Sequence, residues 1–241
     1  MLVLFCILIP FVGTVLGAAA VFLYRGRSGY RSRVILNGLA AGVMIASAFF
    51  SLLIPALEGS VILSLSGVFS GVLFFCFAEW LADRLMPVSH LSGRRSMAFW
   101  AITLHNLPEG MAVGIAAAGF FMGADGMTAA TCIALAVGIA IQNIPEGAIV
   151  SLPLKEKKGK TKAFGAGVIS GIVEPIGAFL AMILSESTAM TLPFFLAFAA
   201  GAMLAVAVGE LARDLAGGGM GGKVAFAVGL TLMTALDVIL A

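Results

Sequence analysis

The fold of this chain is decided by two short stretches, His105-Asn106-Leu107-Pro108-Glu109-Gly110 and Gln142-Asn143-Ile144-Pro145-Glu146-Gly147. They share one pattern, so the chain contains an internal repeat. Each stretch lies inside a long apolar segment, where ionisable side chains are rare, costly and functional by default. The first residue of each stretch and its glutamate are four apart, which places them on one helix face. The pair therefore predicts a polar site carried by two helices in an apolar surrounding.

The composition is that of a membrane protein. Of 241 residues, 61% are hydrophobic and 11% are charged, whereas a soluble domain has roughly 25% charged residues. A net charge of +2, with no basic face interleaved with aromatics, argues against a nucleic-acid partner. Cys6, Cys76 and Cys132 stand singly in apolar stretches and are interpreted as small packing residues. The expected surrounding is the lipid bilayer.

Eight apolar stretches are predicted to cross that bilayer. A spanning helix needs about 20 apolar residues, and clusters of glycine, proline and charge separate the stretches. They lie near 2–24, 34–57, 61–83, 97–120, 128–153, 163–185, 192–213 and 223–241. The loops between them are short, so we expect a single all-α transmembrane domain over 1–241.

The 14 lysines and arginines predict the orientation of these spans. All of them fall at alternate connections, within 25–33, 84–95, 155–162 and 213–223, and the other three connections hold none. Short cytoplasmic loops carry an excess of Lys and Arg. We therefore expect both termini outside, in a plasma membrane or bacterial inner membrane.

Successive spans run in opposite directions, so the two motifs should form an inverted pair. Many secondary transporters hold their substrate at such a repeat interface, near the bilayer midplane. Pro108 and Pro145 cannot donate a backbone hydrogen bond to the residue four positions earlier, which predicts a kink beside each glutamate. Glu174-Pro175 repeats this device in the sixth span. Polar backbone freed at membrane depth is tolerated where it lines a cavity or is buried in protein.

The residue types of the cluster favour a divalent transition metal. Imidazole, carboxylate and amide oxygen suit zinc, iron, manganese, cobalt or cadmium, and the lack of a thiolate argues against copper(I). Glu109 and Glu146 could neutralise one ion, and Asn106, Asn143 and Glu174 could form a second, harder position. A binuclear site is therefore open. Metal binding would displace protons from the carboxylates, so metal–proton exchange is a hypothesis.

Further motifs extend the pattern along nearly the whole chain. They are AGVMIASAFFSLLIPALEG (41–59), ADRLMP (82–87), GIVEPIGA (171–178) and AAGAMLAVAVGEL (199–211). With HNLPEG and QNIPEG, these stretches resemble the ZIP (Zrt/Irt-like) family of metal transporters, in its bacterial GufA-like branch. Two Pro-Glu-Gly motifs on consecutive membrane helices, followed by Glu-Pro, are highly specific in combination.

The resemblance implies a 3+2+3 inverted-repeat bundle of eight spans, outward termini and uptake toward the cytoplasm, and it makes a homodimer plausible. It implies a principal metal site formed by His105, Glu109, Gln142 and Glu146. A neighbouring position would be formed by Asn106, Asn143 and Glu174, with the same two glutamates bridging. Met44 and Ser51 resemble positions that line the transport path, and Glu210 is a further candidate for it.

The chain departs from the family pattern at two ligand positions. Many members have histidine where this chain has Gln142, and some relatives have aspartate where it has Asn143. The first departure removes a nitrogen ligand and the second removes a negative charge. These departures weaken the inference to zinc, which stays the first candidate substrate from the resemblance, with cadmium, iron and manganese open beside it.

Two other functions are weighed against transport. An intramembrane metal-dependent hydrolase would use the same ligands to activate water, but a catalytic zinc site needs an open position and a general base. Neither HExxH nor a Gly-x-Ser nucleophile is apparent. A nontransporting metal receptor would need a soluble part to relay a signal, and the loops offer none. The sequence thus predicts a transporter rather than an enzyme, with no organic cofactor.

Overall fold

Every regular element in the described part of the chain is a helix. The structure is a computed structural model that describes residues 1–23, 30–85, 93–124, 127–185, 191–215 and 219–240. Within these ranges the side chains of two predicted site residues, His105 and Glu210, lie outside the described set. The described ranges do not include Arg25, Arg27 or His90.

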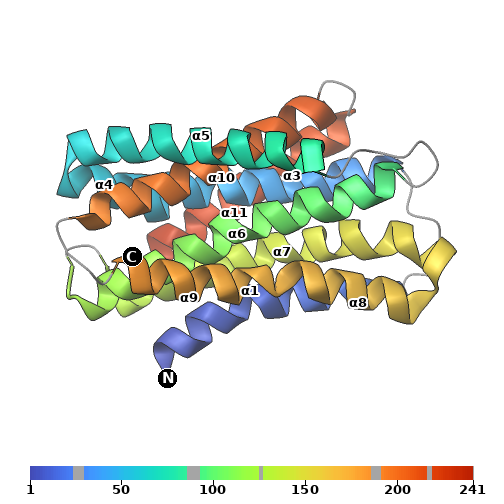
Figure 1. The fold of residues 1–241 in the computed structure, drawn as a ribbon, viewed down its shortest axis with the longest axis horizontal. Helices are drawn as coiled ribbons and strands as arrows, with labels where there is room; N and C mark the ends of the chain where they lie inside the picture. Colours follow the sequence, from blue (N-terminus) through green and yellow to red (C-terminus); the bar gives the residue numbers. More distant parts are fainter. Residues whose placement is uncertain (24–29, 86–92, 125–126, 186–190, 216–218, 241) are drawn as a thin grey trace.

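The helices lie roughly along the long axis of an elongated bundle (Figure 1). They are α1 (Leu2–Ala18), α2 (Ala20–Leu23), α3 (Tyr30–Ala46), the π-helix η1 (Ser47–Leu53), α4 (Ile54–Gly59), α5 (Val61–Leu85), α6 (Gly93–Phe121), α7 (Ala129–Lys158), α8 (Lys160–Gly171), α9 (Val173–Ser185), α10 (Leu192–Leu215) and α11 (Met220–Leu240).

Seven helical stretches among the described residues are long and apolar enough to cross a membrane. They are Leu2–Leu23, Tyr30–Gly59, Val61–Leu81, Ala129–Lys155, Lys160–Leu184, Leu192–Gly209 and Met220–Ile239. The stretch predicted near 97–120 falls within α6, which has 29 residues but is not among the seven. His105, Asn106 and Glu109 lie in this helix and lower its mean hydropathy. The predicted helical membrane protein is confirmed, and the eighth crossing stays a prediction.

The helices pack in matched pairs. Helix α1 lies along α7 and α6 lies along α9, while α5 lies along α10 and α3 lies along α11. In an inverted repeat the first three predicted spans correspond to the last three, and the fourth corresponds to the fifth. Under this correspondence the pair α1–α7 becomes α9–α6, and the pair α5–α10 becomes α11–α3. An inverted repeat predicts this pairing, because each contact in one half then has a counterpart in the other.

The bundle is apolar outside and polar within. Large apolar side chains are exposed on its surface, among them Ile62 at 81% and Phe69 at 67%. Seven polar or charged side chains are buried between α1, α6, α7 and α9: Thr14, Asn106, Glu109, Gln142, Asn143, Glu146 and Glu174. A surface of this kind suits lipid, and the buried polar groups mark the functional interior.

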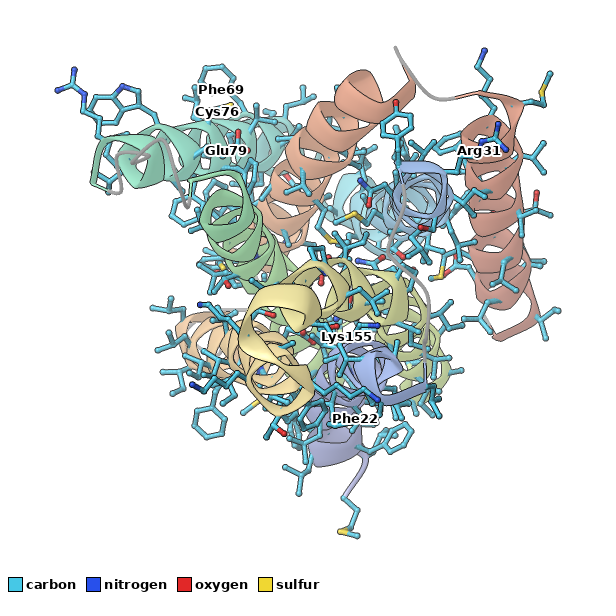
Figure 2. The ribbon with its side chains drawn as sticks, turned by 90° about the vertical axis from the view of Figure 1, so that its right-hand side faces the viewer. Phe22, Arg31, Phe69, Cys76, Glu79 and Lys155 are labelled. Carbon is cyan, nitrogen blue, oxygen red and sulfur yellow. The ribbon has the colours of Figure 1, made fainter. Side chains whose placement is uncertain are left out.

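The described basic side chains lie at helix ends. Arg31 is near the start of α3, Arg84 is near the end of α5, and Lys155 is near the end of α7. These ends gather at the right of Figure 1, while the two termini lie in its left half. Figure 2 looks onto the right-hand end and labels Arg31 and Lys155. The arrangement fits the predicted orientation, which stays a prediction.

Candidate metal site

A side-chain hydrogen bond joins the two repeated motifs. Gln142 on α7 donates a hydrogen bond from Nε2 to Oε1 of Glu109 on α6, over 2.7 Å. Both side chains are fully buried. The sequence predicted that these two faces would share a site, and the structure places their polar ends in contact.

The carboxylate of Glu174, in the first turn of α9, accepts a second group of side-chain hydrogen bonds. Asn143 donates from Nδ2 to Oε2 over 2.8 Å, and Asn106 donates from Nδ2 to Oε1 over 3.2 Å. The hydroxyl of Thr14 on α1 also donates to Oε1. Donors from three other helices therefore converge on this one buried side chain.

The amide groups at this site all present their oxygens away from these carboxylates. Because the NH₂ groups of Asn106, Gln142 and Asn143 donate to Glu109 or Glu174, each amide oxygen must point elsewhere. All three oxygens are buried and have no hydrogen-bond partner among the described atoms. Buried polar atoms are nearly always satisfied, so these three oxygens, on side chains bonded to two buried carboxylates, are candidate ligands for a cation. Amide and carboxylate oxygens are suitable ligands for one.

Two further predicted ligands lie on the same helices. Glu146 is 3% exposed and follows Gln142 by four residues on α7, so it shares that helix face. His105 precedes Glu109 by four residues on α6, and its side chain lies outside the described set. Among the described side chains, no three of His, Cys, Asp and Glu lie close enough to hold one ion.

The glycine of each motif permits the close helix contact that builds the site. A Cβ on Gly110 would lie 2.0 Å from the carbonyl oxygen of Glu174, and one on Gly147 would lie 2.1 Å from that of Thr14. No side chain fits at such a distance, so α6 meets α9, and α7 meets α1, backbone to backbone. Sequence reasoning gave these glycines no separate role.

Two of the three prolines beside a glutamate lie within one long helix each, and the third lies shortly after a helix boundary. Helices α6 and α7 continue through Pro108 and Pro145. In the sixth span α8 ends at Gly171 and α9 begins at Val173, and Ile172 between them keeps a helical backbone with its N–H bonded to the carbonyl of Val168 over 3.1 Å. Glu174 is thereby placed at the start of a helix, beside the carbonyl of Ser170, which accepts a hydrogen bond from Asn106 over 3.0 Å.

Two of the residues predicted to line the transport path, Ser51 and Met44, have described contacts with other parts of the bundle. Ser51, in η1, is buried and donates to Oδ1 of Asp237 on α11 over 2.8 Å. Met44 is fully buried in an apolar cluster with Phe75 and Val206. No side-chain contact is described for Glu210. Roles of these three residues in the path stay predictions.

Thr14 is the site residue that sequence reasoning missed. It is the one hydroxyl-bearing side chain of α1, in the sequence LVLFCILIPFVGTVLGA. A lone polar residue in an apolar span was the available signal. This signal does not identify the hydrogen-bond partner of Thr14, because Glu174 is 160 positions away in the chain.

Comparison with known proteins finds similarity to several proteins that are named zinc transporters. It is 32% identical to the zinc transporter GufA of Myxococcus xanthus over 203 residues, 76% of each chain. It is 31% identical to the zinc transporter ZIPB of Bordetella bronchiseptica over 219 residues, 83% of this chain and 68% of that one. The human zinc transporter ZIP11 is 43% identical over 156 residues, 60% of this chain and 43% of ZIP11.

The extent of these matches differs between relatives. The chain spans less than half the length of the plant and vertebrate relatives that it matches. No protein-family model matches the chain. The matches to GufA and ZIPB, however, cover at least two thirds of both proteins in each pair. The chain therefore belongs to the ZIP family.

Proposed function

We propose that this chain transports a divalent transition metal across a membrane, with zinc as the first candidate substrate. The observation that carries the proposal is the set of three buried amide oxygens without hydrogen-bond partners, on side chains that donate to the carboxylates of Glu109 and Glu174. Glu146 is a third buried carboxylate, on the same helix as Gln142 and Asn143. A cation would satisfy these oxygens, and the carboxylates would neutralise it. The relatives GufA, ZIPB and ZIP11 are all named zinc transporters, which supports the same substrate.

The principal site in this proposal uses His105, Glu109, Gln142 and Glu146. Asn106, Asn143 and Glu174 form the neighbouring position, so that two ions could bind side by side. The hydrogen bond between Gln142 and Glu109 supports the first group, and the bonds from both asparagines to Glu174 support the second. Cadmium, iron and manganese remain candidate substrates, because geometry and availability decide between metals with similar ligands.

The proposed topology is eight spans in a 3+2+3 inverted repeat, with both termini outside and uptake toward the cytoplasm. The matched helix pairs support the repeat, and the basic helix ends opposite the termini support the orientation. A homodimer in a plasma or inner membrane, and exchange of metal against protons, complete the proposal as predictions. The transporter names of the relatives favour this function over a hydrolase or a receptor.

Uptake of zinc and cadmium into proteoliposomes tests the proposal. The intact chain is compared with Glu146→Ala and His105→Ala at two pH values. Ile144→Ala is the matched control, because this residue is on the same helix as Glu146 but is 43% exposed on the apolar surface. We expect uptake by the intact chain and the control, and loss of uptake in both site variants. A folded intact chain that gives no flux would contradict transport, and pH-independent flux would contradict proton exchange.

A further inference from the structure

Helix α1 supplies one polar side chain to the site, and the contact that it makes is unusual. A threonine in a membrane helix commonly donates its hydroxyl to the carbonyl four residues earlier in its own helix. For Thr14 that carbonyl belongs to Pro10, and it accepts Nδ2 of Asn143 over 3.5 Å. The Thr14 hydroxyl instead crosses to Oε1 of Glu174 on α9.

The packing around Thr14 makes this crossing possible. A Cβ on Gly147 of α7 would lie 2.1 Å from the Thr14 carbonyl oxygen, and a Cβ on Gly171 of α8 would lie 2.9 Å from Thr14 Cγ2. The two glycines let α1 approach closely on both sides. Thr14 is fully buried as a result, and its methyl group fills the space that Gly171 leaves.

The contact completes the hydrogen bonding of the Glu174 carboxylate. Oε2 accepts from Asn143, while Oε1 accepts from Asn106 and Thr14. Rotation of this carboxylate would break the bonds that turn the two asparagine oxygens away from it. Residues that hydrogen-bond to metal ligands hold those ligands in orientation. Their loss typically costs about 10- to 100-fold in metal affinity or activity.

We propose that Thr14 is a positioning residue for the metal site: its hydroxyl fixes Glu174, and Glu174 in turn holds Asn106 and Asn143 with their oxygens directed to the ion. The inference rests on the proposed metal site and deepens it. It assigns to α1, which carries none of the predicted ligands, a part in metal affinity. Thr14 acts through Glu174 and does not itself bind the ion.

The test compares Thr14→Val with Thr14→Ser in the full chain. Valine keeps the shape and the methyl contact but lacks the hydroxyl, whereas serine keeps the hydroxyl. Zinc Kd is measured by titration calorimetry in detergent, and zinc KM by uptake into proteoliposomes. We expect Thr14→Val to raise Kd and KM by about 10- to 100-fold, and Thr14→Ser to stay near the parent values.

A matched control is Thr234→Val on α11, whose hydroxyl donates to the carbonyl of Leu230 in its own helix. It should leave both constants unchanged. Helicity and size-exclusion profiles check assembly, and Thr14→Ala replaces Thr14→Val if the latter does not assemble.

A double-mutant cycle separates positioning from a structural role. In a Glu174→Ala background, Thr14→Val should have no further effect on zinc Kd, because the group through which it acts is gone. Equal Kd values for Thr14→Val and Thr14→Ser, or an undiminished effect in the Glu174→Ala background, would overturn the inference. Failure of the proposed function is read separately, from the flux of the intact chain.

Discussion

Gln142 of α7 and Glu109 of α6 are joined by a hydrogen bond of 2.7 Å in the interior of the bundle, although they are 33 positions apart in the chain. The donor is the amide nitrogen, so the amide oxygen is left over and has no hydrogen-bond partner among the described atoms. In this arrangement the glutamine takes a position where many family members have histidine. It supplies a donor to the carboxylate, and in the proposed site its oxygen would be a ligand of the ion.

Replacement of Gln142 by leucine should weaken metal binding. Gln142→Leu removes the donor to Glu109 together with the amide oxygen. We expect zinc Kd to rise at least about 10-fold and the free energy of unfolding to fall by about 1–3 kcal/mol, since a buried carboxylate oxygen loses its donor. Calorimetric titration and thermal unfolding measure these changes. Ile144→Leu is the control on the same helix, and a parent-like Kd for Gln142→Leu would remove Gln142 from the site.

Alanine at either motif glycine should impair folding. A Cβ at Gly110 or Gly147 would lie about 2 Å from a carbonyl oxygen of the neighbouring helix, so the helices must separate, at a cost of about 1–3 kcal/mol. Gly165→Ala in α8 is the matched control, because no atom beyond its chain neighbours and its own helix backbone lies within 4 Å of its Cβ position. It should be neutral or stabilising by up to about 1 kcal/mol. Equal unfolding temperatures for the three variants would contradict the close contacts.

Zinc should stabilise the folded chain. A metal that binds only the folded state raises the free energy of unfolding by about 2.7 kcal/mol at a free concentration 100 times its Kd. We expect zinc and cadmium to raise Tm and a chelator to reverse the effect. Magnesium should have little influence, because it favours octahedral oxygen sites and retains its waters. A magnesium shift as large as that of zinc would speak against a transition-metal site.

The orientation can be read from cysteine labelling in cells. Glu58 at the end of α4 and Lys160 at the start of α8 are both exposed, and these helix ends lie at opposite ends of the bundle in Figure 1. In a Cys76→Ala background, Glu58→Cys should react with a membrane-impermeant thiol reagent added outside. Lys160→Cys should react only after permeabilisation, because basic loops stay cytoplasmic. The reverse pattern would invert the predicted topology.

The helical class of the protein and several of the polar side chains buried in its interior were predictable from the sequence, for two physical reasons. The bilayer requires long apolar helices, and this pattern is local. Polar residues in such helices are costly, so the two motifs and Glu174 stand out without any knowledge of their partners. The span predicted near 97–120 shows the limit of this reasoning. The polar residues that make α6 stand out also lower its mean hydropathy, so α6 is not among the seven candidate spans.

The contacts within the site were decided by the tertiary structure alone. That Asn106 and Asn143 donate to Glu174 rather than to each other depends on how four helices cross. Those crossings depend on Gly110 and Gly147, which read as ordinary glycines until a neighbouring backbone is placed against them. Thr14 shows the same limit, since a hydroxyl in an apolar helix has no assigned partner before the fold brings α1 to α9. Residue types and their spacing along one helix are local properties, whereas partners between helices follow from packing, which a sequence pattern does not contain.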